Sequence, residues 1–288
     1  MRSTEEMYEL ILGYARVDHR IRAVLLNGSR ANKLVPSDKY QDFDIVYVVD
    51  DIESFKAGSS WLNHFGKRLM LQIPESMRHP SNDGHVSYLM LFEDGNRIDL
   101  SLIPQTNLEL IADDSLTIKL LDKDGLLPEY PLSNDSSYYE KKPTKLEYDS
   151  CCNNFWWCLQ NVGKGIVRNE IPYAMMMYHT IVREELHDMI AWSIAMDYDF
   201  KVSAGKMGKF FKNYLPEKLY SQYLRTYSST EIEAFWNALF EMCVLFSQIA
   251  KKVGNGLGYD YELNDELNMM GYLRQLKTES IDERRRNT

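Results

Sequence analysis

Apolar residues recur with two different spacings along the chain, and the change between them divides the sequence into two regions. Up to residue 130, short apolar runs of the strand type alternate with a few segments of helical spacing. Beyond residue 144 the apolar residues recur about every 3.6 positions, which is the period of an α-helix. The pattern therefore predicts an α+β domain followed by an α-helical domain.

The first region is predicted to form one sheet with a few helices. Apolar residues fill both faces after Asp44, so the strand over 42–49 is expected at the centre of the sheet. Glu93-Asp94-Gly95-Asn96 is typical of a hairpin turn. The predicted strands cover residues 21–26, 42–49, 68–73, 86–92, 97–103 and 117–121, the last at an edge. The predicted helices cover residues 4–17, 31–34, 52–65 and 107–112.

A linker is predicted where the two regions meet. Three of the nine prolines fall in residues 127–144, together with Ser, Asn and Asp. We expect a first domain over residues 1–130, a linker over 131–144, a helical domain over 145–278 and a frayed tail over 279–288. The helices predicted in the second region cover residues 145–167, 171–196, 204–215, 217–227, 230–253 and 262–276.

Composition narrows the class of protein. The chain has 288 residues, 44% of them hydrophobic and 26% charged, which is typical of a globular protein with one large or two ordinary domains. No apolar run approaches the roughly 20 residues of a membrane helix, and the N-terminus lacks the apolar segment of a secretion signal. The four cysteines match no zinc pattern and are expected to be reduced and buried. A cytoplasmic protein is the expectation.

The net charge separates two classes of partner. At −9, the chain lacks the basic surplus expected of a protein that binds nucleic acid. An acidic cleft attracts cationic small molecules such as polyamines and guanidinium compounds. We therefore expect a small cationic substrate rather than a nucleic acid or a membrane.

The most informative stretch combines a Gly-Ser turn with two carboxylates. Gly28 and Ser29 follow an apolar run, and Asp42 and Asp44 open the next one. Alternate residues of a strand share a face, so the two carboxylates should project together while Phe43 points into the core. Paired carboxylates suit a hard divalent ion such as Mg²⁺, and a glycine turn lets a phosphate approach the backbone. The stretch predicts a site for a nucleoside triphosphate.

These residues also carry a family resemblance. Gly28-Ser29 followed by Asp42-Phe43-Asp44 is similar to the signature of the DNA polymerase β-like nucleotidyltransferases. The phrases NGSRAN at 27–32, QDFDIV at 41–46 and NRIDL at 96–100 resemble those of the aminoglycoside 6-adenylyltransferases, which modify streptomycin. The resemblance extends over most of the chain. It implies a mixed sheet and a helical domain that closes the cleft. It also implies transfer of AMP from ATP to a hydroxyl, with the streptomycin 6-hydroxyl as the first expected acceptor.

The resemblance assigns roles to individual residues. Asp42 and Asp44 are expected to bind Mg²⁺, and Asp99 matches the third carboxylate, which serves as general base or as a metal ligand. The Gly28-Ser29 turn is expected to hold the phosphates. Arg30 is a candidate for a further phosphate contact, with a surface ion pair as the alternative. Lys206 of the helical domain is a candidate to reach the nucleotide, with a solvated helix start as the alternative.

Other interpretations remain open at the level of sequence. Glu184 and Asp188 share a helix face and are candidates to contact guanidinium groups of the substrate, although a solvated face is the commoner explanation. The acceptor could instead be a lincosamide-like molecule or a protein. A catalytically silent nucleotide-binding domain is the third possibility, but such a relative would be expected to lose one of the three carboxylates.

Overall fold

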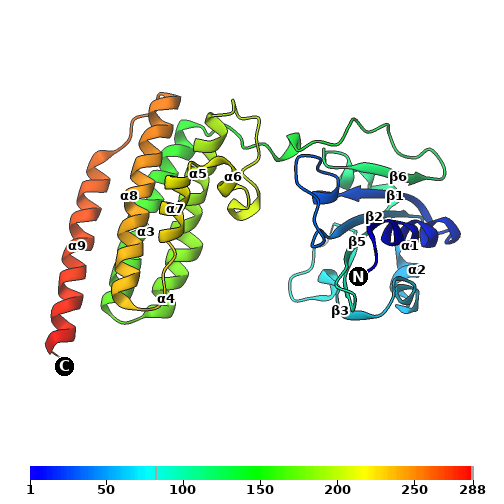
Figure 1. Cartoon of the computed structure of the whole chain (residues 1–288), viewed down its shortest axis with the longest axis horizontal. Coiled ribbons are helices and arrows are strands. Elements are labelled where there is room, and N and C mark those ends of the chain that lie inside the picture. The colour runs from blue at the N-terminus through cyan, green and yellow to red at the C-terminus, as the bar shows by residue number, and fades with distance from the viewer. Residues whose placement is uncertain (82, 287–288) are drawn as a thin grey trace. The chain divides into compact units, whose positions relative to one another are not determined.

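The computed structural model describes residues 1–81 and 83–286, and the side chains as far as Ser280. The chain divides into two compact units, one over Met1–Ser137 and the other from Tyr138 onward. Figure 1 shows the strands gathered in the first unit and the long helices in the second. The fold is therefore of the α+β class, as the spacing of apolar residues predicts.

The first unit is built on a six-stranded mixed sheet. The strands are β1 (Ile21–Asn27), β2 (Phe43–Val49), β3 (Arg68–Gln72), β4 (Val86–Phe92), β5 (Arg97–Pro104) and β6 (Ile118–Asp122). They lie in the order β3-β4-β5-β2-β1-β6. Among the described strands, β2 and β5 run parallel and the other neighbouring pairs are antiparallel. Strand β6 lies at an edge, as the sequence predicts.

Strand β2 lies near the middle of the sheet because both of its faces are apolar. Phe43, Ile45 and Tyr47 are buried in one core cluster, and Val46 and Val48 belong to another. Helix α1 (Thr4–Val17) starts with a capping box at Ser3 and packs against the first cluster. The Tyr47 hydroxyl donates a hydrogen bond of 2.7 Å to the carbonyl of Ile11 and so ties the helix to the strand.

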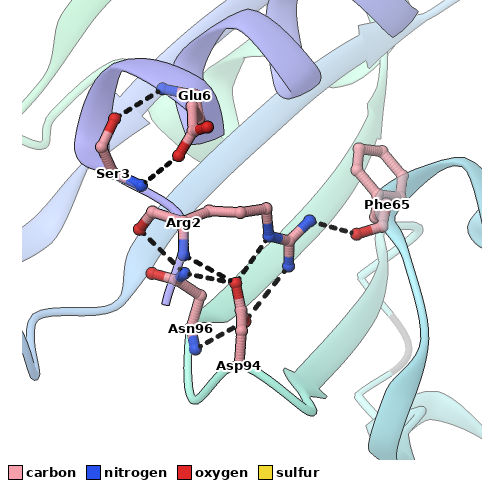
Figure 2. Close-up of polar contacts among 6 residues, drawn as sticks. All are labelled: Arg2, Ser3, Glu6, Phe65, Asp94 and Asn96. Atoms are coloured by element: carbon pink, nitrogen blue, oxygen red, sulfur yellow. Dashed lines mark hydrogen bonds and ion pairs between the residues drawn. The ribbon is translucent and has the colours of Figure 1, made fainter.

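The start of the chain is anchored to the turn between β4 and β5 (Figure 2). The Arg2 guanidinium pairs with Asp94 at 2.7 Å and also donates to the Phe65 carbonyl at 2.7 Å. Asn96 donates to the same carboxylate at 2.9 Å. The Arg2 side chain holds the pKa of Asp94 well below its usual range. Three segments far apart in the sequence are thereby fixed where β5 begins.

Three predicted helices of the first unit differ from the structure. Residues 31–34 form turns rather than a helix. The 3₁₀ segment Gly28–Arg30 lies directly before them, and its carbonyls accept the N–H of Ala31. The helix predicted over 52–65 is broken: α2 (Ile52–Lys56) ends before Gly58, and Ser60–Phe65 forms a separate 3₁₀ segment. Residues Gln105–Ile111 are 3₁₀ rather than α-helical, with Asn107 outside helical backbone angles.

The described part of the second unit consists mainly of helices, as predicted. Its helices are α3 (Lys145–Val167), α4 (Ile171–Met176), α5 (Arg183–Met196), α6 (Phe211–Tyr214), α7 (Glu217–Arg225), α8 (Ile232–Leu257) and α9 (Leu263–Arg286). A π-helical segment, Met177–Val182, joins α4 to α5. The rings of Phe155 in α3 and Phe246 in α8 stack at 3.6 Å in the core.

Two predictions for the second unit are wrong. Residues 204–215 do not form one helix, because Gly205, Met207 and Gly208 have positive φ angles, and only Phe211–Tyr214 is α-helical. The frayed tail expected over 279–288 is helical as far as Arg286, while 287–288 lie outside the described residues. No helix in the described part of the chain is long and apolar enough to cross a membrane.

Candidate active site

The Gly-Ser turn lies directly against one of the predicted carboxylates. Asn27 ends β1 opposite Asp44 of β2, and Gly28 follows with φ of +69°. A Cβ atom on Gly28 would come within 2.1 Å of the Asp44 carboxylate oxygen Oδ2. Glycine is required here for its backbone angle and for the absence of a side chain. The turn and the carboxylate therefore form one continuous surface.

Asp44 and Asp99 are brought together by the parallel strand pair. They are register partners on β2 and β5, and Asp42 immediately precedes β2. Burial, followed by repulsion from Asp99 and Asp42, raises the pKa of Asp44 to about 6. Two neighbouring carboxylates oppose ionisation of each other unless a cation lies between them. The structure thus brings the three predicted carboxylates into electrostatic contact.

Arg97 contacts two of these three carboxylates. Its Nε and Nη2 donate to the two oxygens of Asp99 at 2.7 and 2.6 Å, and its Nη1 lies 3.4 Å from Asp42 Oδ2. These contacts raise the pKa of the Arg97 guanidinium. Strand alternation already places Arg97 on the same face of β5 as Asp99, two residues away, but the sequence alone assigns it no role in the site.

The carboxylates have the donor chemistry of a Mg²⁺ site. Hard oxygen ligands suit Mg²⁺, and the raised pKa of Asp44 indicates a position where a cation is favoured. Among the side chains that the structure describes, no three His, Cys, Asp or Glu form a ready-made metal cluster. Arg97 occupies oxygens of Asp99 and Asp42 that such a cluster would use. The residues fit the metal once these oxygens turn toward it.

Arg30 ties the Gly-Ser turn to the segment before β2. Its Nε donates to the Asp42 carbonyl at 3.0 Å, and its Nη2 donates to the Gln41 carbonyl at 2.8 Å. Its guanidinium lies 3.8 Å from the centre of the Phe43 ring, and burial lowers its pKa. Gln41 in turn donates to the Ser29 carbonyl at 3.2 Å. Arg30 therefore positions the backbone of the turn and of Asp42.

Asn27 is a second residue at the site that the sequence did not reveal. Its Nδ2 donates to Asp114 at 2.8 Å and to Thr117 at 3.1 Å, while its Oδ1 is buried and has no hydrogen-bond partner among the described residues. Those partners lie 87 and 90 residues away in the sequence. No local signal could have predicted contacts over that separation.

A cavity of about 430 Å³ opens beside the carboxylates. Asp44 and Asp99 line it together with Asn27, Asp83 and His85. His85 pairs with Asp83 and lies 3.2 Å from Glu75, which lines a neighbouring cavity of about 740 Å³. The surroundings of the site are therefore rich in carboxylates.

Lys206 and the acidic residues predicted on α5 line one cavity in the second unit. This cavity has a volume of about 610 Å³, and its wall includes Lys206, Glu184, Asp188 and Glu140. Burial and the neighbouring carboxylates raise the pKa of Asp188 to about 6. Lys206 and the two acidic residues of α5 thus line the same cavity of the second unit.

Comparisons with known proteins identify relatives over nearly the whole chain. The sequence profile of a family described as streptomycin adenylyltransferase matches residues 1–276. An aminoglycoside 6-adenylyltransferase of Bacillus subtilis is 44% identical over 270 residues, covering 92% of this chain and 95% of the relative. One from Campylobacter jejuni is 42% identical over 289 residues, covering 98% and 99%. The crystal structure of an aminoglycoside 6-adenyltransferase from Bacillus subtilis is 38% identical, with a TM-score of 0.48 and coverage of 96% and 99%.

Proposed function

The chain belongs to the streptomycin adenylyltransferase family, and we propose that it transfers AMP from ATP to the 6-hydroxyl of streptomycin, thereby giving resistance. The observation that carries this proposal is the pairing of Asp44 with Asp99 directly against the Gly28 turn. This arrangement provides a place for a triphosphate beside carboxylates that can hold a metal. It is therefore suited to an aminoglycoside adenylyltransferase reaction.

Each carboxylate has a distinct role in the proposed reaction. Asp42 and Asp44 would hold Mg²⁺, which offsets the charge of the triphosphate and orients its α-phosphorus when it is bound. Asp99 would accept the proton of the acceptor hydroxyl as that oxygen forms a bond to the α-phosphorus. The bond between the α-phosphorus and the bridging oxygen breaks, and pyrophosphate leaves with its electron pair. Asp99 as a further metal ligand is the alternative assignment.

The turn would bind the phosphates through its backbone. The backbone N–H groups of the turn are its donors, and Ser29 adds a hydroxyl. Because Gly28 has no side chain, the Asp44 carboxylate can lie directly against this turn. We assign Arg30 to positioning this turn, because two of its donors already bind carbonyls. A contact of Arg30 or Lys206 with the nucleotide phosphates stays a prediction.

The acceptor is proposed to be drawn in by negative charge. Streptomycin carries guanidinium groups, and the net charge of −9 and the carboxylates around the site favour a cation. We also place the reaction in the cytoplasm, where ATP is available to the enzyme. If added salt leaves the apparent affinity for streptomycin unchanged, this electrostatic contribution is refuted.

The decisive experiment measures pyrophosphate released from ATP and Mg²⁺ with and without streptomycin. We expect release that depends on streptomycin, together with an antibiotic product heavier by one adenylyl group, that is, AMP less one water. Lincosamides and other aminoglycosides serve as comparison acceptors, and the position of the new ester is read from the product by NMR. A folded protein that releases no pyrophosphate with any of these acceptors would contradict the proposal.

A further inference from the structure

Arg97 makes a bidentate contact with Asp99 at the candidate site, and the proposed function gives this contact no role. Its guanidinium binds both oxygens of Asp99, at 2.7 and 2.6 Å, and reaches Asp42 at 3.4 Å. Asp99 is only 21% exposed at its side chain, so the pair is partly shielded from water. Charge-assisted bidentate pairs of this kind are about twice as strong as neutral hydrogen bonds.

A divalent cation and this guanidinium need the same oxygen atoms. A carboxylate whose two oxygens both accept from an arginine has few lone pairs left in the plane for a metal. A second cation placed beside the guanidinium would also be repelled by it. Binding of the metal to Asp99 and Asp42 therefore requires Arg97 to give up these carboxylates.

We propose that Arg97 is an internal counter-cation that competes with Mg²⁺ for Asp99 and Asp42, so that metal binding becomes coupled to nucleotide binding. This inference rests on the metal site of the proposed function, with Asp99 as a further ligand of the metal. A guanidinium displaced from two carboxylates needs a new anionic partner. The triphosphate held at the Gly28 turn, which lies against Asp44, provides one at the same end of the sheet. Metal without nucleotide is then bound weakly, and the two together are bound tightly.

The neighbouring turn provides a matched comparison. Arg2 also makes a bidentate pair with an aspartate, Asp94, which is not one of the three carboxylates of the site (Figure 2). Removing Arg2 costs an ion pair that involves none of Asp42, Asp44 and Asp99. Arg2→Gln therefore separates a general loss of stability from a specific effect on the metal site.

The test is a titration of the full-length protein with Mn²⁺, followed by electron paramagnetic resonance, with and without a non-hydrolysable ATP analogue. We expect Arg97→Gln to bind Mn²⁺ roughly tenfold more tightly than wild type without nucleotide, the size expected for loss of a partly exposed charge-assisted pair. The analogue should tighten Mn²⁺ binding less in this variant than in wild type, since linkage makes the coupling reciprocal. Arg97→Lys keeps the charge but not the planar fork and should lie between the two.

The outcomes separate the two proposals. Tighter Mn²⁺ binding by Arg97→Gln, with Arg2→Gln unchanged, supports the counter-cation. Equal Mn²⁺ affinity in wild type and Arg97→Gln overturns it but leaves the metal site intact, provided that Asp44→Asn weakens binding. Absence of Mn²⁺ binding by wild type even with the analogue overturns both this inference and the proposed metal site. Circular dichroism of each variant establishes that the titrated protein is folded.

Discussion

Two residues of the candidate site, Gly28 and Asp44, are the most sensitive to substitution. Gly28 has no side chain and a positive φ, and the Asp44 carboxylate fills the place where a Cβ would lie. Asp44 in turn is an acid held in a position that disfavours its own charge. Substitutions at these two positions should therefore change stability in opposite directions while both abolish activity.

We predict that Gly28→Ala destabilises the protein and removes activity. The new methyl group would meet Asp44 Oδ2 at 2.1 Å, and the left-handed backbone alone costs about 1–3 kcal/mol for a residue with a side chain. Urea unfolding measures the loss. Gly13→Ala is the matched control, because nothing lies within 4 Å of its Cβ in α1, and it should be stabilising by about 0.5–1 kcal/mol. Equal stability of the two variants would refute this account.

We predict that Asp44→Asn is inactive yet more stable than wild type at pH 8 in the presence of a chelator. The pKa of Asp44 rises from 3.8 to about 6 on folding, so the folded state binds more protons between these values and wild-type stability falls as pH rises through them. Above pH 6, the burial of the ionised Asp44 lowers the free energy of unfolding of wild type by at most about 3 kcal/mol. The amide variant does not have this loss.

Chemical unfolding at several pH values measures this effect, and the pyrophosphate assay measures the loss of activity, which should be at least about a hundredfold. The difference in stability between the two proteins should vanish near pH 4. A wild type whose stability does not fall between pH 4 and pH 6 would show that Asp44 is not destabilised by burial.

At the scale of elements, local patterns predicted the strands well and the irregular segments poorly. Alternation placed Phe43 and Ile45 in the core and the acids together, because a strand has one repeating geometry. The breaks in the predicted helices depend on backbone angles, such as the positive φ of Met207, that side-chain spacing does not encode. The partners of Asn27 could not be predicted, because folding alone brings them near.

In the helical unit, the buried side chain of Arg183 holds the C-terminal end of α7. Arg183 begins α5 directly after the π-helical segment and is 4% exposed. It donates to the carbonyl and hydroxyl of Thr226, the C-cap of α7, at 2.8 and 2.9 Å, and lies 3.8 Å from the Tyr227 ring centre. The cation therefore satisfies the carbonyl end of α7, where the helix dipole favours positive charge.

We predict that Arg183→Lys lowers the free energy of unfolding by about 2–3 kcal/mol, because a lysine cannot reproduce the planar fork of donors at a buried site. Arg225→Lys, at the last residue of α7, is the matched control. Its pair with Glu241 is exposed, so it should change stability by less than about 0.5 kcal/mol. Urea midpoints measure both, and similar values for the two variants would contradict the assigned role of Arg183.

At the scale of the whole molecule, the two units have separate hydrophobic cores and different chemistry. The proposed reaction centre belongs to the unit with the sheet. The four cysteines belong to the helical unit, where all are buried. A thiol reagent therefore reports on the helical unit alone.

We predict that the thiols react with Ellman's reagent far more slowly in the native protein than in urea. Burial raises the pKa of each thiol, to about 12 for Cys152 against an ordinary value of 9.0. At pH 8 this shift lowers the fraction of Cys152 that is ionised by roughly a thousandfold, and the thiolate is the reacting form. Absorbance of the released thionitrobenzoate gives the rate. Fast native labelling of all four thiols would show that the helical core opens readily.

The register of β2 against β5 also limits how a gene of this kind can evolve. One codon inserted within either strand would turn Asp44 or Asp99 to the opposite face, because side chains alternate along a strand. Codons gained or lost between the strands, as in the segment from Ser76 to His85, leave that pairing unchanged. Length variation among descendants should therefore accumulate in the connections that border the cavity, so that new acceptors can be explored while the acid pair is inherited intact.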